Sequence, residues 1–598
     1  MLQIILGVIM TVLQTTILEN INSPSDVKKL SLGEMNILAD EIRQGIINRV
    51  DKVGGHLGPD LGIVETTIAL HYVFDSPKDK FIFDVSHQCY PHKMLTGRKQ
   101  GFLDPLNNLE ISGYSNQNES EHDHFMIGHT STSVTLATGV AKARDLKGEN
   151  YNVIALIGDG SLSGGEAFEG FNNASVLNSN FIIIVNDNEM SIAENQGGLY
   201  KNLKELRESN GKYENNWFKA FGFDYVYVEK GNDIETLIKA FSDVKDCTKP
   251  VVVHIHTLKG KGFTKAVENK EWGHWTTPGI LNENQSAGGA APECYETITK
   301  DYILNKVKQD NTVIAINAAT PGVFWWDKEF RNKLGKNYTD VGIAEQHAVG
   351  YASGLARNGA KPIFAVMTSF IQRAYDQLSQ DLALNNSPAT ILVYWGGISS
   401  ADCTHLGLFD IPFICNIPNI VYLAPTCKEE YLKMLDWSVE QNKHPVAIRV
   451  PSANYVVSGV KDTTDYSILN KYKVVESGSK VAVLGLGDFF ELAKEVKEEL
   501  KIKFGINATL INPRFITGID KELLNSLKSN HDIVITLENG TLDGGFGEKI
   551  SRFYGNSDVK VLNYGAEKEF IDRVPTDILN QRYHLTKELI AQDVEKII

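Results

Sequence analysis

Cysteine is scarce in this chain, which has only six cysteines among 598 residues. They stand at positions 89, 247, 294, 403, 415 and 427, and no two of them form a CxxC pair. Disulfide-rich scaffolds and cysteine-ligated zinc sites need closely spaced cysteines. We therefore expect neither kind of site, and the sparse usage predicts a cytoplasmic protein.

Basic residues are in the minority as well. The chain has 59 Lys and Arg against 74 Asp and Glu, so its formal net charge is −15 at pH 7. Binding of nucleic acid depends on clustered Lys and Arg that contact phosphates. The charge balance therefore predicts that nucleic acid is not a partner.

A hydrophobic run long enough to cross a membrane is missing too. The apolar run IILGVIMTVL at residues 4–13 is short for a bilayer, and it lacks the basic segment that opens a signal peptide. We interpret residues 1–16 as a helical or disordered extension, which an upstream start codon would explain. We expect no membrane partner.

What the chain does contain is an alternation of short apolar runs and helical patterns. Strands are predicted at 80–86, 151–160, 180–188 and 249–260, then at 311–319, 361–370, 387–397, 420–425 and 445–451, and then at 480–488, 507–515 and 532–539. Helices are predicted at 165–177 and 233–244. Continuous Val and Ile runs separated by helices are typical of parallel sheets covered on both faces.

Two breaks divide this alternation. The segment 277–293 is rich in Gly, Ala, Asn and Pro, and a second break lies near 455–475. We therefore predict an α/β protein with three domains, at 17–295, 296–460 and 470–598.

The segment VIALIGDGSLSGGEAFEGFNNASVLNSNFIIIVNDNEMSI, residues 153–192, indicates a cofactor. One predicted strand ends at Gly158-Asp159-Gly160 and the next ends at residues 186–188. Because parallel strands end at the same sheet edge, Asp159 and Asn188 are expected to converge there. A carboxylate and an amide oxygen are hard ligands that suit Mg²⁺ together with phosphate oxygens. Glycines at 158, 160, 164 and 165 let a diphosphate approach the backbone closely.

This spacing favours thiamine diphosphate over other phosphate-containing cofactors. A nicotinamide fingerprint has the spacing G-x-G-x-x-G, whereas here it is G-x-G-x-x-x-G, and NDN stands where the ribose-binding acid is expected. The P-loop pattern is absent from this segment. The pattern of GDG, about 27 residues and then NDNEM between two apolar strands therefore predicts thiamine diphosphate and Mg²⁺.

The chemistry of that cofactor predicts a second element, since its aminopyrimidine needs a carboxyl group in a dry pocket to assist proton transfer. In TDVGIAEQHAVGYASGLA, residues 339–356, Glu345 stands where a strand gives way to a helix. A lone Glu near a helix start would be only a cap. With the GDG segment in the same chain, we predict that Glu345 activates the cofactor.

At this point the chain resembles the 1-deoxy-D-xylulose-5-phosphate synthase family, relatives of transketolase. The resemblance covers nearly the whole chain from about residue 17. It is carried by GGHLGPDLGIVETTIALHYVFDSPKDKFIFDVSHQCYPHKMLTGR at 54–98, by 119–148 with GHTSTS, by NDNEMSI, by DVGIAEQHAV and by SFIQRAYDQ. It implies a three-domain, transketolase-like homodimer that joins pyruvate to glyceraldehyde 3-phosphate with loss of CO₂, in the biosynthesis of isoprenoids and thiamine.

The resemblance also implies the site residues, position by position. Mg²⁺ would be held by Asp159, Asn188 and the carbonyl group of Met190. The cofactor would contact His56, Gly128, His129, Ser131, Gly158, Gly160, Ser161, Asn188, Glu345, Phe370 and Arg373. Catalysis would involve Glu345, His56, His87, His405 and, with a one-residue shift, His274. The substrates would contact His56, His87, Arg373, Asp402 and His405. We interpret His254 and His256 as structural.

The chain departs from the family where the family binds the acceptor's phosphate. No Lys or Arg occurs between residues 390 and 426, and one arginine position of the family falls on Tyr394 or Trp395. A second falls on Ser452 in RVPSAN. Loss of two charge-assisted contacts predicts weaker acceptor binding, by roughly 3–6 kcal/mol if each is worth about 1.5–3 kcal/mol.

These departures keep alternatives open. A synthase-like enzyme with a different, unphosphorylated acceptor is one, and Trp325, Trp326 and Trp395 would suit an apolar or sugar-like partner unless they are core residues. A transketolase that takes two-carbon units from a ketose is another. A catalytically silent binding subunit is a third, against which the intact Asp159, Asn188 and Glu345 count.

Overall fold

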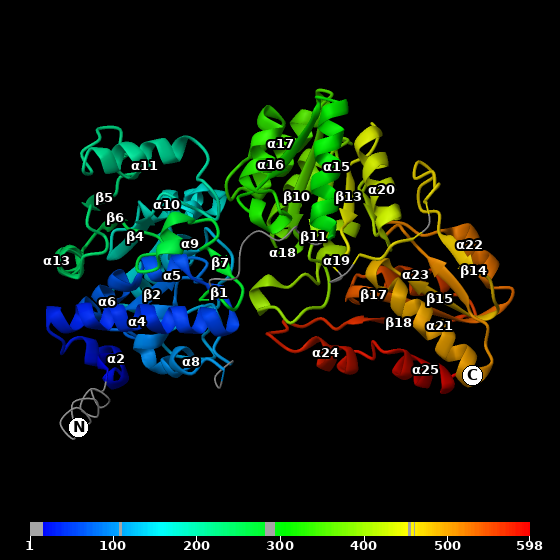
Figure 1. The fold of residues 1–598 in the computed structure, drawn as a ribbon, viewed down its shortest axis with the longest axis horizontal. Coiled ribbons are helices and arrows are strands. Elements are labelled where there is room, and N and C mark those ends of the chain that lie inside the picture. The colour runs from blue at the N-terminus through cyan, green and yellow to red at the C-terminus, as the bar shows by residue number, and fades with distance from the viewer. Residues whose placement is uncertain (1–15, 107–109, 282–292, 453–455, 460) are drawn as a thin grey trace, which may run out of the picture. The chain divides into compact units, whose positions relative to one another are not determined.

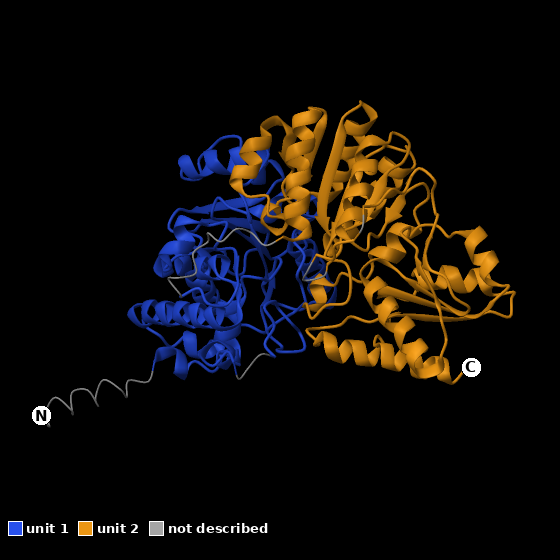
Figure 2. Ribbon diagram, turned by 45° about the vertical axis from the view of Figure 1, so that its right-hand side comes forward, with its two compact units in different colours: residues 1–289 blue, residues 290–598 orange. Residues whose placement is uncertain are grey.

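The structure is a computed structural model of the chain that describes residues 16–106, 110–281, 293–452, 456–459 and 461–598. The chain separates into two compact units, Met1–Gly289 and Ala290–Ile598 (Figure 2). The extension predicted for residues 1–16 lies outside the described residues except for Thr16, and so does most of the linker predicted at 277–293.

The first unit is built on a parallel sheet of five strands in the order β2-β3-β4-β6-β5 (Figure 1). The strands are β2 (Lys80–Phe83), β3 (Val153–Gly158), β4 (Phe181–Asp187), β5 (Asp224–Val228) and β6 (Pro250–His256). The main helices are α4 (Leu32–Val53), α6 (Val64–Val73), α9 (Ser133–Lys147), α10 (Gly165–Ala174), α11 (Gly198–Glu208) and α13 (Ile234–Val244).

Both faces of this sheet are buried, which explains the continuous apolar runs. Ala155 and Ile157 of β3 pack in one cluster with residues of α9, α10 and α11. Ile154 and Leu156 point the other way, into a cluster with residues of α6 and α13. Alternate side chains of one strand therefore serve two separate cores.

The second unit contains two more sheets (Figure 1). A six-stranded parallel sheet has the order β12-β13-β11-β10-β8-β9, with β8 (Val313–Asn317), β9 (Tyr338–Asp340), β10 (Lys361–Met367), β11 (Thr390–Tyr394), β12 (Val421–Leu423) and β13 (Val446–Arg449). A five-stranded sheet has the order β14-β16-β15-β17-β18, with β14 (Lys473–Glu476), β15 (Lys480–Gly485), β16 (Thr509–Asn512), β17 (His531–Thr541) and β18 (Lys560–Ala566).

The predicted strands and parallel sheets are confirmed, with a few differences. Strand β14 is antiparallel to β16. Residues 368–370, predicted as the end of a strand, belong to helix α18 (Thr368–Ile371). Strands β5, β9, β14 and β18 and the two-residue strands β1 (Gly55–His56) and β7 (Trp275–Thr276) were not predicted, because they are short or carry partly exposed side chains that interrupt the apolar pattern. The division into three domains stays a prediction.

In the part of the chain that the structure describes, no helix is both long and apolar enough to cross a bilayer.

Candidate active site

Asp159 and Asn188 lie at one edge of the first sheet. Strands β3 and β4 are parallel with Gly158 opposite Asn186, and the backbone N–H of Asp159 donates to the Asn186 carbonyl at 3.0 Å. Asp159 and Asn188 are both buried. The convergence predicted from the spacing is therefore observed.

The residues at this edge fit a divalent cation. The Asp159 carboxylate accepts hydrogen bonds from the Met190 backbone N–H at 3.0 Å and from Asn195 Nδ2 at 2.7 Å. The Asn188 Oδ1 atom is buried and has no hydrogen-bond partner among the residues that the structure describes. A buried acceptor without a donor is unfavourable, so this oxygen fits the role of a metal ligand.

The two glycines of the GDG turn serve different purposes at the same edge. Gly160 opens a short 3₁₀ helix, Gly160–Ser163, and a Cβ atom on Gly160 would come within 2.7 Å of Ser191 Oγ. A Cβ atom on Gly158 would meet nothing within 4 Å. Glycine is thus required by close packing at 160, whereas at 158 its missing side chain leaves open space at the strand end.

The GHTSTS segment lies against this turn. Ser131 has a left-handed backbone, φ +75°, and its hydroxyl donates to the carbonyl oxygen of Ser161 at 2.8 Å. The Asp84 carboxylate accepts from the backbone N–H groups of Ser131 at 2.8 Å and Ser133 at 2.9 Å. Asp84, which the sequence reasoning missed, therefore holds the segment in place. Gly128 is buried and His129 half-buried on the same segment.

Three predicted histidines form a cluster. The ring centroids of His56 and His87 are 4.9 Å apart, those of His56 and His274 5.6 Å, and those of His87 and His274 5.2 Å. Strand β1 (Gly55–His56) pairs antiparallel with β7 (Trp275–Thr276), with His56 opposite Trp275, and this pairing brings His274 to His56.

Two residues of this cluster were missed by the sequence reasoning. The Tyr114 ring lies 5.7 Å from the His56 ring. The Lys259 ammonium contacts His274 Nδ1 at 3.1 Å and donates to the Ser191 carbonyl at 2.6 Å. A signal for Lys259 was present, because a cation that follows β6 must lie at the same sheet edge as Asp159.

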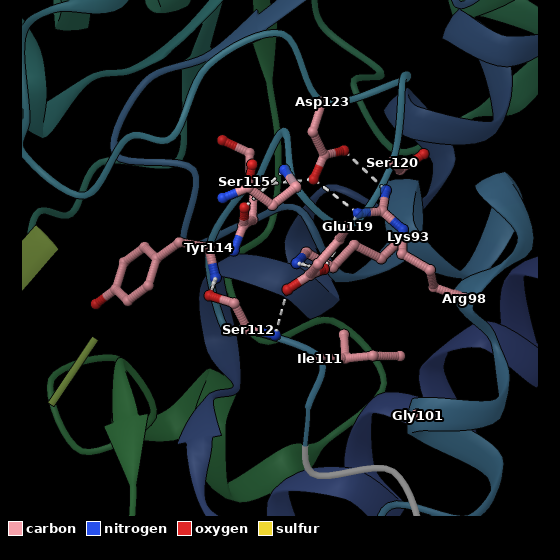
Figure 3. A network of polar contacts seen from close by, with 12 residues as sticks. Lys93, Arg98, Gly101, Ile111, Ser112, Tyr114, Ser115, Glu119, Ser120 and Asp123 are labelled. Atoms are coloured by element: carbon pink, nitrogen blue, oxygen red, sulfur yellow. Dashed lines mark hydrogen bonds and ion pairs between the residues drawn. The ribbon is translucent and has the colours of Figure 1, made fainter. Parts of the chain in front are cut away.

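A buried polar network supports the segment that carries Tyr114 (Figure 3). Glu119 accepts from the backbone N–H of Ser112 at 2.7 Å and from Lys93 Nζ at 2.6 Å. Asp123 accepts from Arg98 at 2.7 and 2.8 Å. Asp123 also accepts from the backbone N–H of Asn116 at 2.8 Å, so two carboxylates hold the backbone on either side of Tyr114.

His254 and His256 have structural partners, as interpreted. His254 is buried, with Nε2 2.9 Å from Asp187 and Nδ1 2.8 Å from the Tyr225 hydroxyl. His256 lies 3.2 Å from Glu189.

In the second unit, Glu345 is the first residue of helix α17 (Glu345–Arg357), which follows β9. Its side chain is buried, with Arg373 Nη1 3.4 Å from Oε2. Burial raises the pKa of Glu345 above its ordinary value, although Arg373 opposes the shift. Burial thus disfavours the charged form of Glu345, and the protonated form can donate a hydrogen bond.

His405 packs against Phe370, whose ring centroid is 5.6 Å from that of the His405 ring. Phe370 and Arg373 stand three residues apart on adjoining helical turns, α18 and Gln372–Ala374. The Thr404 hydroxyl lies 2.9 Å from His405 Nδ1, and the backbone N–H of His405 donates to the Asp402 carbonyl at 2.9 Å. The predicted residues of this unit therefore lie together.

The loop that carries Asp402 and His405 has no Lys or Arg of its own, but Arg573, which follows β18, contacts it. Arg573 Nε lies 3.6 Å from Asp402, and the Arg573 backbone N–H donates to the Ala401 carbonyl at 3.0 Å. Arg573 also pairs with Asp572 at 3.1 Å. The sequence reasoning missed Arg573, since nothing in the local pattern links residue 573 to residue 402.

The positions where the resemblance implies arginines differ in their surroundings. Tyr394 is a core residue whose hydroxyl donates to Thr299 Oγ1 at 2.7 Å. Trp395 is 49% exposed. The Ser452 hydroxyl donates to the Gly396 carbonyl at 2.9 Å and lies 2.9 Å from Asp488. The hypothesis that Trp326 meets a partner is wrong, because its side chain is fully buried in the core.

Comparison with known proteins places the chain in a family. The family model described as 1-deoxy-D-xylulose-5-phosphate synthase matches residues 18–217. Models of transketolase match as well: the thiamine diphosphate binding domain at 126–313, the pyrimidine binding domain at 295–457 and the C-terminal domain at 470–590.

Similar proteins match over nearly their whole length. The 1-deoxy-D-xylulose-5-phosphate synthase of Clostridium beijerinckii is 36% identical, over 97% of this chain and 99% of that protein. The synthase of Clostridium tetani is 37% identical, over 96% of this chain and 98% of that protein. The synthase of Francisella tularensis subsp. novicida is 36% identical, over 98% of this chain and 99% of that protein. The chain therefore belongs to the 1-deoxy-D-xylulose-5-phosphate synthase family.

Proposed function

We propose that the protein is a thiamine diphosphate-dependent transferase that joins pyruvate to glyceraldehyde 3-phosphate, with loss of CO₂, to give 1-deoxy-D-xylulose 5-phosphate. Such a product would feed isoprenoid and thiamine biosynthesis. The observation that carries the proposal is the buried Asp159 carboxylate with the unpartnered Asn188 oxygen on one sheet edge. The reaction itself is supported by the name that the near full-length relatives share.

The first unit would hold the charged end of the cofactor. Asp159, Asn188 and the Met190 carbonyl would bind Mg²⁺, whose charge offsets that of a diphosphate. The glycines at 158 and 160 and the hydroxyls of Ser131 and Ser161 would line the diphosphate. When bound, thiamine diphosphate supplies a carbon nucleophile and an electron sink for decarboxylation.

The second unit would supply proton chemistry. A neutral Glu345 carboxyl would donate a hydrogen bond to a ring nitrogen, a role that its burial and raised pKa support. Phe370 and Arg373, on the adjoining turns, would hold that carboxyl group and the cofactor's ring in place. His405, with Asp402 in its loop, would hydrogen-bond the oxygens of the reacting substrates.

The histidine cluster of the first unit would also hydrogen-bond substrate oxygens. His56, His87 and His274 lie within 5.6 Å of one another by ring centroids, so they can present several N–H groups to one small substrate. Each negative charge that develops on an oxygen during carboligation needs such a donor.

A second candidate differs only in the acceptor. Ser452, at a position where the family has an arginine, pairs with the Asp488 carboxylate, and Arg449 nearby in sequence pairs with the buried Asp410 at 2.7 Å. A carboxylate close to Ser452 disfavours a phosphate there. This observation favours an enzyme that takes an unphosphorylated aldehyde.

One assay separates these candidates. The purified protein, with thiamine diphosphate and Mg²⁺, is given pyruvate labelled with ¹⁴C at C1, and CO₂ release is measured with and without glyceraldehyde 3-phosphate. Strong stimulation by the phosphorylated acceptor, with formation of the deoxyxylulose phosphate, supports the synthase. CO₂ release without such stimulation supports the second candidate, an enzyme that takes an unphosphorylated aldehyde. No release in either case contradicts the proposal.

The metal site has its own test. Asp159→Asn keeps the shape of the side chain and removes its charge, so the rise in melting temperature on adding Mg²⁺ with thiamine diphosphate is expected to disappear. The matched control Asp243→Asn, at an exposed position of α13, should keep that rise.

We also infer, from the family resemblance, a homodimer with domains at 17–295, 296–460 and 470–598. Light scattering during size-exclusion chromatography tests the dimer, since a chain of 66.3 kDa gives twice that mass as a dimer. Limited proteolysis tests the domain boundaries.

A further inference from the structure

Lys259 is a buried cation that no part of the proposed function has used. It follows β6 at the sheet edge that carries Asp159, and only 2% of its surface is exposed. Its Nζ atom lies 2.6 Å from the Ser191 carbonyl oxygen and 3.1 Å from Nδ1 of His274. A lysine buried to this degree has a specific set of partners, because desolvation of the charge is otherwise unfavourable.

The chemistry of these two contacts determines which ring nitrogen of His274 carries the proton. A lysine ammonium has three N–H donors and no acceptor, and a carbonyl oxygen can only accept. Lys259 therefore donates to Ser191 and donates to His274 Nδ1. A neutral imidazole that accepts at Nδ1 carries its proton on Nε2.

The surroundings keep the His274 ring neutral. Burial, the Lys259 charge and the neighbouring His87 and His56 all hold the pKa of His274 well below its ordinary value. Burial also lowers the pKa of Lys259 to about 7, and Asp159 opposes that shift. A neutral Lys259 amine would also have a lone pair that can accept, so it is the ammonium form that fixes the direction of the contact with His274 Nδ1.

We propose that Lys259 is a positioning residue that holds His274 in the neutral tautomer with the proton on Nε2. His274 then acts as a hydrogen-bond donor to a substrate oxygen and not as a proton acceptor. The proposal rests on the proposed function in one respect, the membership of His274 in the active site. It assigns the direction of the hydrogen bond that this residue makes.

The direct test is the tautomer itself. The protein without cofactor, labelled with ¹⁵N in its histidine rings, is examined by NMR at about pH 6, on the acid side of the lowered pKa of Lys259, about 7. His274→Gln identifies the His274 signals by difference among the fifteen histidines. We expect Nδ1 to be unprotonated and Nε2 to carry the proton. A proton on Nδ1 in this spectrum would overturn the proposal.

Variants of Lys259 separate positioning from a merely structural role. Lys259→Met should let the Nδ1–H tautomer appear and should lower kcat for CO₂ release by about 10- to 100-fold. Lys259→Arg, which also has only donors, should keep the wild-type tautomer. The control Lys239→Met, at an exposed position of α13, should leave both readouts unchanged.

The outcomes also distinguish this proposal from the proposed function. An unchanged His274 spectrum in Lys259→Met would overturn the role of Lys259. If Lys259→Met fails to fold, the wild-type spectrum decides alone. A wild-type protein that has the Nε2–H tautomer but releases no CO₂ would contradict the proposed function and leave the positioning role intact.

Discussion

Removal of the Arg98 guanidinium tests whether the network of Figure 3 holds the segment that carries Tyr114. Arg98 donates to both oxygens of Asp123, at 2.7 and 2.8 Å, and the Asp123 side chain is 0% exposed. In Arg98→Met, Asp123 keeps only His92 Nε2 at 3.1 Å and the Asn116 N–H at 2.8 Å. Its carboxylate is then buried without a full positive charge beside it.

The expected loss of stability follows from that geometry. Breaking a buried ion pair by removing one partner costs about 3–5 kcal/mol, and the two remaining hydrogen bonds place this case near about 3 kcal/mol. For a domain of this size each kcal/mol lowers the melting temperature by roughly 2–4 °C, so the expected decrease is about 6–12 °C. Calorimetry measures the decrease, and peptide-resolved hydrogen exchange should locate it in residues 86–127.

The pH dependence provides a second check. Burial alone would raise the pKa of Asp123, but hydrogen bonds from Arg98 and His92 outweigh it and lower the pKa. A lowered folded-state pKa stabilises the protein above the unfolded value, about 4, and this contribution is lost as the pH falls below it. In Arg98→Met burial dominates, so Asp123 takes up a proton at a higher pH. The difference between the two proteins should therefore shrink as the pH falls from neutrality toward the unfolded value, about 4.

A control and a refuting outcome complete this test. Lys147→Met removes a cation whose side chain is 67% exposed, and its effect should stay within about 0.5 kcal/mol. If Arg98→Met melts within about 2 °C of the wild type at neutral pH, the buried pair does not carry the stability assigned to it.

Three further predictions concern the second unit. Glu345→Gln should reduce CO₂ release at least about 100-fold, because an amide cannot exchange a proton, with little change in melting temperature, because the amide keeps the shape of the side chain and burial disfavours the charge that it removes; a large loss of stability would contradict this. Arg449→Met should lower the free energy of unfolding by about 3–5 kcal/mol, and adding Asp410→Leu should recover much of it, as chemical denaturation would measure. Tyr394→Phe should cost only about 1 kcal/mol, the hydrogen bond to Thr299, and should leave KM for the acceptor unchanged; a raised KM would return Tyr394 to the substrate site.

Local chemistry made much of this fold predictable. Strands such as β3 and β4 are apolar on both faces because both faces are covered. The result is a continuous Val and Ile run that can be recognised in the sequence. The meeting of Asp159 and Asn188 could be predicted for a related reason. Parallel neighbours end at the same edge, so two strand ends in the sequence become two neighbours in space.

Other features had no local signal. Strand β14 is antiparallel and largely exposed, so its residues do not show the buried pattern. Tyr394 ends β11 with its side chain on the core face, whereas Trp395, one residue later, is half exposed with φ +59°. From the sequence, one arginine position implied by the resemblance could fall on either of these two residues. Only the backbone turn between them decides which side chain is exposed to solvent.

The sequence by itself therefore determined most of the strands, the parallel sheets, the meeting of Asp159 and Asn188 at one sheet edge and the family, because each depends on neighbours along the chain or on one strand crossover. Tertiary structure alone decided which distant groups act on one another. The pairing of β1 with β7 brings His274 to His56, Lys259 reaches His274 Nδ1, and Arg573 meets the loop of Asp402. Burial, which raises the pKa of Glu345, is likewise a property of the packed chain, since it depends on what surrounds a side chain in three dimensions.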